Sequence, residues 1–239
     1  MSLRGCFVMG TDTGVGKTCV SAALLTWLGQ QGLRAAGFKP VAAGGLDTHT
    51  QLNDDVAALL ASGAQGLSAA AIGPCQLREA CAPSIAAELE GRHIDRSALG
   101  AAAHRLAAQV DVLVAEGAGG VCVPLGPDWD SADLAVDLGL PIVLVVGLRL
   151  GCINHALLSA EALARRGLRL AAWVGNATGP SMPWMAQNTA LLAHELTRRH
   201  SSPCLGIVPW LGDDRAKPSE VVHHLDTRAL SNLLKDFLA

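Results

Sequence analysis

The chain has 239 residues, of which 50% are apolar and 3% aromatic, and its formal net charge is −3. Such a chain can bury one large α/β core built mainly from aliphatic residues. Its acidic balance argues against nucleic-acid binding, which needs a basic face. The longest apolar run, residues 141–147, is too short to span a membrane, and residues 1–9 do not form a signal peptide. The seven cysteines form no C-x-x-C pair and several lie in apolar runs, so we expect a cytoplasmic protein without membrane partners.

The first predicted strand, at residues 6–9, leads directly into a glycine-rich segment. This segment reads GTDTGVGKT at residues 10–18, and a helical pattern follows it. A strand, a glycine-rich turn and a helix form the setting of a phosphate-binding loop, in which backbone N–H groups hold phosphate oxygens. We expect Lys17 to reach the β- and γ-phosphates and the Thr18 hydroxyl to ligate Mg2+. The usual spacing requires glycine at position 11, so this loop is a variant with one extra residue.

Apolar strands and helices alternate along the rest of the chain. Short apolar runs predict strands at residues 6–9, 34–38, 111–115, 141–146, 170–174 and 204–208. Helical spacing predicts helices at residues 20–32, 53–61, 83–90, 95–109, 130–138, 151–166, 184–200 and 219–238. Residues 41–50 are expected to form a loop, and residues 62–82 receive no assignment because their periodicity is weak. The pattern predicts an α/β fold of the P-loop NTPase type, with a mostly parallel sheet, helices on both faces, and one domain over residues 1–239.

Charged side chains follow the carboxyl ends of two predicted strands, where ligands of parallel sheets gather. Lys39 follows the strand at 34–38 and is expected to point into the site, although a solvated loop lysine would give the same pattern. Glu116 opens the segment EGAGG after the strand at 111–115, as acids that hold Mg2+ do, unless it caps a turn. Asp54 or Asp55 could supply a second carboxylate, or could cap the helix that Asn53 begins.

Three other strand ends carry groups suited to a nucleotide or another anion. A glycine-started helix follows the strand at 141–146 and offers free N–H groups to an anion. Asn176 follows the strand at 170–174 and can hydrogen-bond a base edge, while Trp210, near the end of the last strand, can pack on an apolar face. A turn and a core anchor are the simpler explanations of Asn176 and Trp210.

Taken together and in this order, the motifs resemble those of dethiobiotin synthetases, the ATP-dependent cyclo-ligases of biotin synthesis. The matching segments are residues 10–18, 37–41, Asp55, 116–120, 151–155, Asn176 and 209–211. The resemblance spans nearly the whole chain, and the extra loop residue is a feature of that family. It implies that CO2 adds to an amine of 7,8-diaminononanoate, that ATP phosphorylates the carbamate, and that the second amine closes a ureido ring.

The resemblance also implies a role for each matching position. Lys17 and Lys39 would be catalytic, and Thr18, Asp55 and Glu116 would surround Mg2+. The implied nucleotide contacts are Thr13, Gly14, Val15, Gly16, Lys17, Thr18, Cys19, Asp55, Glu116, Gly117, Ala118, Gly119, Asn176, Pro209, Trp210 and Leu211. The implied substrate contacts are Thr13, Lys39, Ala43, Leu150, Gly151, Cys152, Ile153 and Asn154. Family members are homodimers, in which the helix that starts at Gly151 serves the partner's site.

This sequence departs from its apparent relatives at three positions. Ala43 stands where many relatives carry a substrate-contacting serine, and Gly14 stands where some carry an acid. Ala177 replaces an acid that follows the asparagine in some relatives, which bears on selectivity for adenine. Asp213 and Asp214 are further candidates for a ribose contact, without a secure alignment.

Two other classes share this architecture. Amide-forming synthetases of the cobyrinic acid diamide type usually carry a glutaminase domain, for which the chain is too short. Partition and septum-site ATPases carry a second lysine early in the phosphate loop, where this sequence has Asp12. They often also have a basic or amphipathic membrane tail, which the last helix, with its mixed charge, does not resemble.

Overall fold

The computed structural model describes residues 3–47, 49–212 and 216–238. Its centre is a six-stranded sheet in the order β10-β9-β8-β1-β5-β2, in which all neighbouring strands run parallel. The strands are β1 (Gly5–Gly10), β2 (Ala35–Phe38), β5 (Val112–Glu116), β8 (Ile142–Leu148), β9 (Leu170–Ala177) and β10 (Cys204–Val208). Five of these six strands are fully or almost fully buried, as continuous apolar runs require, whereas β10 at the edge is half-buried. The predicted α/β fold is therefore confirmed.

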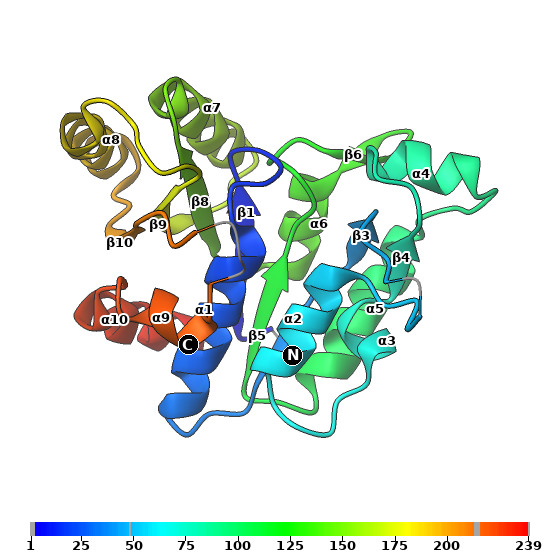
Figure 1. Cartoon of the computed structure of the whole chain (residues 1–239). Coiled ribbons are helices and arrows are strands. Elements are labelled where there is room, and N and C mark those ends of the chain that lie inside the picture. The colour runs from blue at the N-terminus through cyan, green and yellow to red at the C-terminus, as the bar shows by residue number, and fades with distance from the viewer. Residues whose placement is uncertain (1–2, 48, 213–215, 239) are drawn as a thin grey trace.

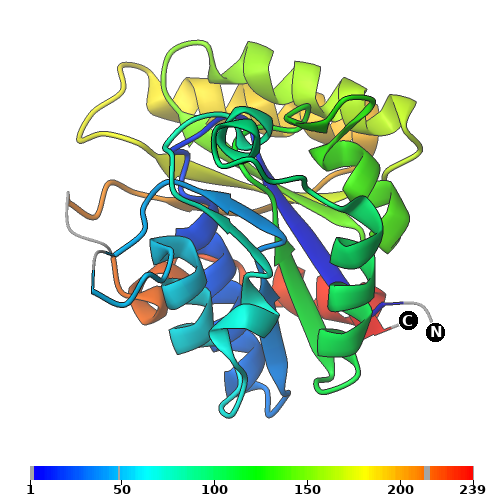
Figure 2. The same ribbon diagram turned by 90° about the vertical axis from the view of Figure 1, so that its right-hand side faces the viewer.

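Helices cover both faces of the sheet (Figures 1 and 2). One face carries α1 (Lys17–Gln30), α2 (Asp54–Ser62), α9 (Pro218–Val222) and α10 (Thr227–Leu238). The other carries α5 (Arg96–Ala107), α6 (Ser131–Leu138), α7 (Cys152–Arg165) and α8 (Met185–His200). Right-handed crossovers require this division, because the chain leaves β1 toward β2 but leaves β5 toward β8. In the described part of the chain, no helix is long and apolar enough to span a bilayer.

The predicted helix caps form as the sequence indicates. The Asn53 side chain accepts hydrogen bonds from the N–H groups of Asp55 and Val56 at the start of α2. The Asp130 side chain accepts from the N–H groups of Ala132 and Asp133 at the start of α6, and the Asp133 side chain accepts from the Asp130 N–H. Both caps satisfy N–H groups that a helix start otherwise leaves unpaired. Since Asn53 caps α2, the Asp55 carboxylate is not needed for the cap and can take part in other contacts.

Two expectations for the connecting segments were incomplete. The expected loop at 41–50 contains β3 (Val41–Ala43), which pairs in parallel with β4 (Cys75–Leu77) from the unassigned region 62–82. That region also forms the one-turn helix α3 (Ala69–Ile72), and α4 (Pro83–Leu89) follows β4. A small hairpin of β6 (Pro124–Gly126) and β7 (Trp129–Asp130) was not predicted. Strands of two or three residues are too short to show a period in the sequence.

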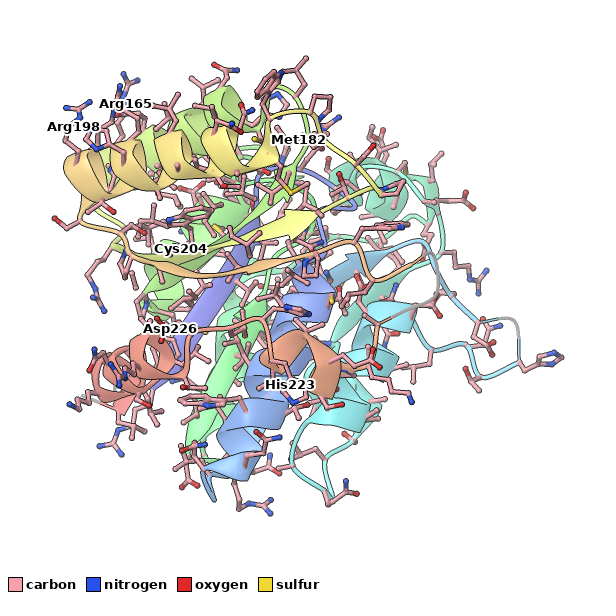
Figure 3. All side chains as sticks on the ribbon, turned by 60° about the vertical axis from the view of Figure 1, so that its left-hand side comes forward. Arg165, Met182, Arg198, Cys204, His223 and Asp226 are labelled. Carbon is pink, nitrogen blue, oxygen red and sulfur yellow. The ribbon has the colours of Figure 1, made fainter. Side chains whose placement is uncertain are left out.

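The prediction of one helix over residues 219–238 was wrong, because the segment breaks into α9 and α10. The chain between them pairs with β10 through a bridge from Gly206 to Leu225, and the Asp226 N–H donates to Leu205 O at 2.6 Å. The Asp226 side chain then caps α10 by accepting from Arg228 and Ala229. In Figure 3, His223 and Asp226 lie in the turn between the two helices. A Cβ on Gly206 would lie 2.1 Å from His224 O, so glycine is required for this close approach.

The crossovers also fix where a ligand can bind. Strands β1 and β5 are neighbours with Val8 opposite Glu116, and the chain leaves their carboxyl ends in opposite directions. Open parallel sheets bind ligands at such a switch point, because the departing loops leave a crevice there. In this chain the crevice lies between the phosphate loop after β1 and the glycine-rich segment after Glu116.

Candidate active site

The phosphate loop joins β1 to α1 and is held by contacts along its length. The Lys17 ammonium donates to Asp12 O at 2.9 Å, so the lysine folds back over the loop. Gly16 has a φ of 90°, and a Cβ there would lie 2.3 Å from the Asn176 amide nitrogen. That amide donates to Val15 O at 3.0 Å. A glycine is therefore needed at position 16 both for its left-handed backbone and for its contact with β9.

Lys17 carries its charge in an unfavourable setting. Its side chain is buried, and burial together with repulsion from the Lys39 ammonium lowers its pKa to about 8. The carboxylates of Glu116 and Asp55 attract the charge but do not offset the loss of water. A phosphate bound beside this ammonium and the loop N–H groups would stabilise the charged form of Lys17 and so offset the cost of its burial.

Lys39 lies beside Lys17 and pairs with both predicted metal-side acids. Its Nζ lies 2.7 Å from Glu116 Oε1, 3.0 Å from Asp55 Oδ2 and 3.0 Å from Gly117 O. Glu116 is fully buried and Lys39 is 3% exposed. Burial opposes the charge on Lys39, but its attraction to the two carboxylates outweighs that cost and raises its pKa. Burial likewise opposes the charge on Asp55, yet the pair with Lys39 lowers its pKa. Lys39 thus points into the site and is not a solvated loop lysine.

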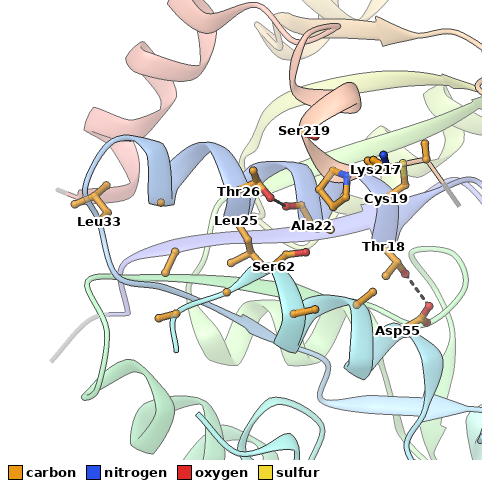
Figure 4. Close-up of a pocket in the computed structure, with 18 residues that line it drawn as sticks. Thr18, Cys19, Ala22, Leu25, Thr26, Leu33, Asp55, Ser62, Lys217 and Ser219 are labelled. Atoms are coloured by element: carbon orange, nitrogen blue, oxygen red, sulfur yellow. Dashed lines mark hydrogen bonds between the residues drawn. The ribbon is translucent and has the colours of Figure 1, made fainter. Parts of the chain in front are cut away.

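The carboxylates also surround the Thr18 hydroxyl. Thr18 Oγ1 lies 2.9 Å from Asp55 Oδ1, the bond drawn in Figure 4, and 2.8 Å from Glu116 Oε1. A hydroxyl has one proton, so it can donate to one of these oxygens at a time. Glu116 Oε2 is buried and has no hydrogen-bond partner within the described residues. An oxygen-rich, acidic set with an unsatisfied buried oxygen fits a hard divalent cation such as Mg2+.

A cleft of about 880 Å³ opens over this group. It collects residues that lie far apart in the sequence and that come from the phosphate loop, β3, α2 and the segment after β5. The predicted site residues that line it are Thr13, Gly14, Gly16, Lys17, Thr18, Lys39, Ala43, Asp55, Ala118 and Gly119. Val15 and Gly117 lie beside these positions, and Val15 is buried. The structure thus brings the predicted phosphate, metal and reacting-group residues to one place.

The residues expected to hold the base do not line the main cleft. Asn176 lies near the end of β9, which extends to Ala177, and contacts the loop through Val15 O, while Pro209, Trp210 and Leu211 follow β10. Trp210 is half-buried and the other two are exposed. Cys19, on the first turn of α1, lines a second cavity of about 730 Å³ that runs between α1 and α2 (Figure 4). This second cavity shares Thr18 and Asp55 with the main cleft. Asp213 and Asp214 lie outside the described residues.

The helix start expected to meet the substrate lies outside the main cleft. Gly151 caps α7 with a φ of 97°, and Leu150 is 90% exposed. Cys152 is buried, whereas Asn154 is exposed and Ile153 is half-buried. Leu150, Gly151 and Asn154 are therefore exposed at the start of α7, and none of residues 150–154 lines the chain's own cleft.

Sequence reasoning missed several residues of the cleft. Asp12 forms an ion pair with Arg149 at 2.6 Å, which ties the phosphate loop to the segment before α7. Cys81 and Cys122 both line the cleft as exposed thiols, and Cys122 Sγ lies 3.5 Å from Arg166 Nη1. The charges of Asp12 and Arg149 are visible in the sequence, but their pairing depends on strand order. No signal in the sequence distinguishes Cys81 or Cys122 from the other cysteines.

Comparisons with known proteins show which family the chain belongs to. A family model described as an AAA domain matches residues 4–216. The chain is 44% identical over 232 residues to the "ATP-dependent dethiobiotin synthetase BioD" of Janthinobacterium sp. (strain Marseille), covering 95% of this chain and 96% of that protein. It is 47% identical over 207 residues to the protein of the same name from Ralstonia nicotianae, covering 86% and 89%.

A solved structure shares the fold at much lower identity. The cell division ATPase MinD of Pyrococcus furiosus superposes with a TM-score of 0.56 at 16% identity, covering 97% of this chain and all of that one. At this identity the likeness concerns the fold alone and carries no function. The two curated relatives, by contrast, match along almost the full chain at over 40% identity. The chain therefore belongs to the dethiobiotin synthetase family.

Proposed function

We propose that the protein forms the ureido ring of dethiobiotin from 7,8-diaminononanoate and CO2, with ATP as the phosphoryl donor. The observation that carries this proposal is the contact of the buried Lys39 and Glu116 with Asp55 and Thr18 beside a phosphate loop. Family membership makes the chain an ATP-dependent ligase. The order of steps we propose is carbamate formation, phosphorylation of the carbamate to a mixed anhydride, and attack by the second amine with release of phosphate.

The residues present fit the electrostatic demands of these steps. A carbamate and a transferring phosphoryl group are both anionic and repel one another unless cations lie between them. Lys17 and Lys39 both reach the cleft floor from different elements and are the cations we assign to that role. Backbone N–H groups of residues 13–19 would hold the phosphates. Thr13 and Ala43, which line the same cleft, would contact the diamine.

We assign Thr18, Asp55 and Glu116 as the residues that would hold Mg2+. When bound there, the ion supplies positive charge to the phosphate oxygens and so favours transfer. Asn176 would hydrogen-bond the base, and Pro209 to Leu211 would cover its apolar face. The exposed segment 150–154 supports a homodimer in which each α7 start binds the substrate carboxylate in the partner's cleft.

We further propose one P-loop domain over residues 1–239 and a cytoplasmic location. The buried apolar residues form one cluster that runs from Cys6 to Phe237, which supports a single domain. All seven cysteines lie in the described residues and are free, as expected in a reducing compartment.

The direct test is an assay for the product. The purified protein is incubated with Mg-ATP, bicarbonate and 7,8-diaminononanoate, and mass spectrometry then looks for one carbonyl in place of two hydrogens. We expect this product to form and to depend on each component. ADP release without it, or at a rate independent of the diamine, would reject the ligase function.

A further inference from the structure

The Lys39 ammonium is surrounded by oxygen atoms of the protein itself. Its Nζ donates to Glu116 Oε1 at 2.7 Å and to Gly117 O at 3.0 Å, and it forms an ion pair with Asp55 Oδ2 at 3.0 Å. An ammonium group has three donors and no acceptor, so two of its donors are occupied and its charge lies between two carboxylates. Lys39 lines the cleft, yet in this state its ammonium is bound to the protein and not available as a whole to a phosphate or a carbamate. To act on either one it must give up at least one of these contacts.

The two carboxylates cannot release Lys39 without a replacement. Glu116 is fully buried, and one of its oxygens already lacks a partner within the described chain. Two acids that share the Thr18 hydroxyl repel each other unless a cation lies between them. A buried carboxylate stripped of its counter-ion is costly, because neither water nor another donor replaces the lost attraction. Lys17 does not replace Lys39 in this structure, since its Nζ donates to Asp12 O and forms no ion pair with Asp55 or Glu116.

A divalent cation is a replacement of the right kind. The carboxylates of Asp55 and Glu116, which now contact Lys39, and the Thr18 hydroxyl would hold such an ion, and Glu116 Oε2 is still without a partner in the described chain. The ammonium and the ion compete for the same negative charge, so each weakens the binding of the other. A phosphate chain changes this balance, because it offers oxygens both to the ion and to the displaced ammonium.

We propose that Lys39 is the resident counter-ion of Asp55 and Glu116, and that it exchanges places with the divalent ion when nucleotide binds. This inference rests on the proposed function for the identity of the ion and the nucleotide. The exchange makes Mg2+ binding weak until nucleotide is present, and it turns the Lys39 ammonium toward the reacting groups only when the metal is in place. Lys39 therefore weakens metal binding while nucleotide is absent. Once the metal is bound, the Lys39 ammonium can donate to the reacting groups.

The exchange is tested by titrating Mn2+ into the nucleotide-free protein and measuring free Mn2+ by electron paramagnetic resonance. Lys39→Met removes the competing ammonium, and we expect Mn2+ to bind at least about tenfold more tightly than to the unaltered protein. Lys17→Met is the matched control, because it removes a charge from the same cleft without touching the carboxylates. We expect it to tighten Mn2+ binding by less than about threefold. Equal tightening in both variants, or none with Lys39→Met, would overturn the exchange.

A second measurement needs no substitution and covers the case in which Lys39→Met does not fold. A crystal structure of the unaltered protein with Mg2+ and ADP should place Lys39 Nζ beyond hydrogen-bond distance of Asp55 or Glu116. An Nζ still bonded to both acids with the ion present would reject the proposal. Both outcomes leave the product assay unaffected, so a failed exchange with normal ring formation is distinguishable from a failed ligase assignment.

Discussion

The two ends of the proposed nucleotide site differ in how many contacts the protein makes there before a ligand binds. At the phosphate end, side chains from α1, α2, β5 and the segment after β2 already form hydrogen bonds and ion pairs with one another. At the proposed base end, Asn176 makes one bond to the loop, and Pro209 and Leu211 are exposed. The comparison indicates that the chemistry depends on geometry fixed by the fold, whereas recognition of the base depends on contacts that the ligand completes. Substitutions at the phosphate end should therefore cost turnover, and those at the base end affinity.

The largest effect is expected from Lys39→Ala. Losing the cation at the reacting groups should lower kcat by on the order of a thousandfold, since it acts on charge that develops in the transition state. Steady-state kinetics with product detection would measure the change, and circular dichroism would check the fold. Near-normal turnover would show that Lys39 is not part of the mechanism and that substitutions at the phosphate end do not lower kcat more than those at the base end.

Gly16→Ala should damage both ends, because Gly16 belongs to the phosphate loop and packs against the Asn176 side chain. The left-handed backbone and the overlap with the Asn176 amide should together lower the free energy of unfolding by about 2–3 kcal/mol. Gly14→Ala is the control, since Gly14 has a φ of 71° but a Cβ there would meet nothing within 4 Å in the described chain. It should cost about 1 kcal/mol. Chemical denaturation compares the two, and equal losses would show that the contact with Asn176 does not matter.

The phosphate end should also respond to pH through Lys17. Its pKa is lowered to about 8, so its charge is complete below that pH and is lost as the pH rises through it. Because the charged form binds phosphate, kcat/KM for ATP should fall by up to about tenfold per pH unit above pH 8. The measurement is a kcat/KM profile from pH 6.5 to 9.5 at about 0.15 M salt. A profile that stays flat across that range would mean that Lys17 keeps its proton in the free enzyme.

Asn176→Ala tests the base end directly. We expect KM for ATP to rise by about three- to tenfold, the range of one lost hydrogen bond, with kcat changed by less than about twofold. Asn188→Ala on α8 is the control, because Asn188 is half-buried and its amide donates to Trp184 O at the start of the same helix. A fall in kcat as large as that of Lys39→Ala would contradict the expectation that substitutions at the base end change affinity and not turnover.

The smallest effect is expected from Ala43→Ser. Ala43 is half-buried in the cleft wall, and a serine there would add the hydroxyl that many relatives carry. KM for the diamine should fall by about two- to fivefold, with KM for ATP unchanged. Initial rates at saturating ATP would measure the change. An unchanged KM would show that Ala43 does not face the diamine.

The sequence predicts the elements that local chemistry determines. The six strands of the sheet, the Asn53 and Asp130 caps and the strand-end positions of Lys39 and Glu116 all follow from short-range patterns. The pairing of β3 with β4 and the break between α9 and α10 do not, because both depend on contacts with distant strands. The contact of Lys39 with Glu116 joins residues 77 positions apart in the sequence. Their positions after two strands predict that both lie at the same edge of the sheet, but not that they bond to each other.

The most direct test of the account joins phosphate transfer to ring closure in one experiment. The protein is supplied with Mg-ATP, 7,8-diaminononanoate and 13C-labelled bicarbonate, and ADP and dethiobiotin are quantified in the same samples. We expect one ADP to form for each dethiobiotin, with the label in the ureido carbonyl, and no steady ADP release when the diamine is left out. ADP formed in the absence of dethiobiotin, or dethiobiotin without the label, would contradict it.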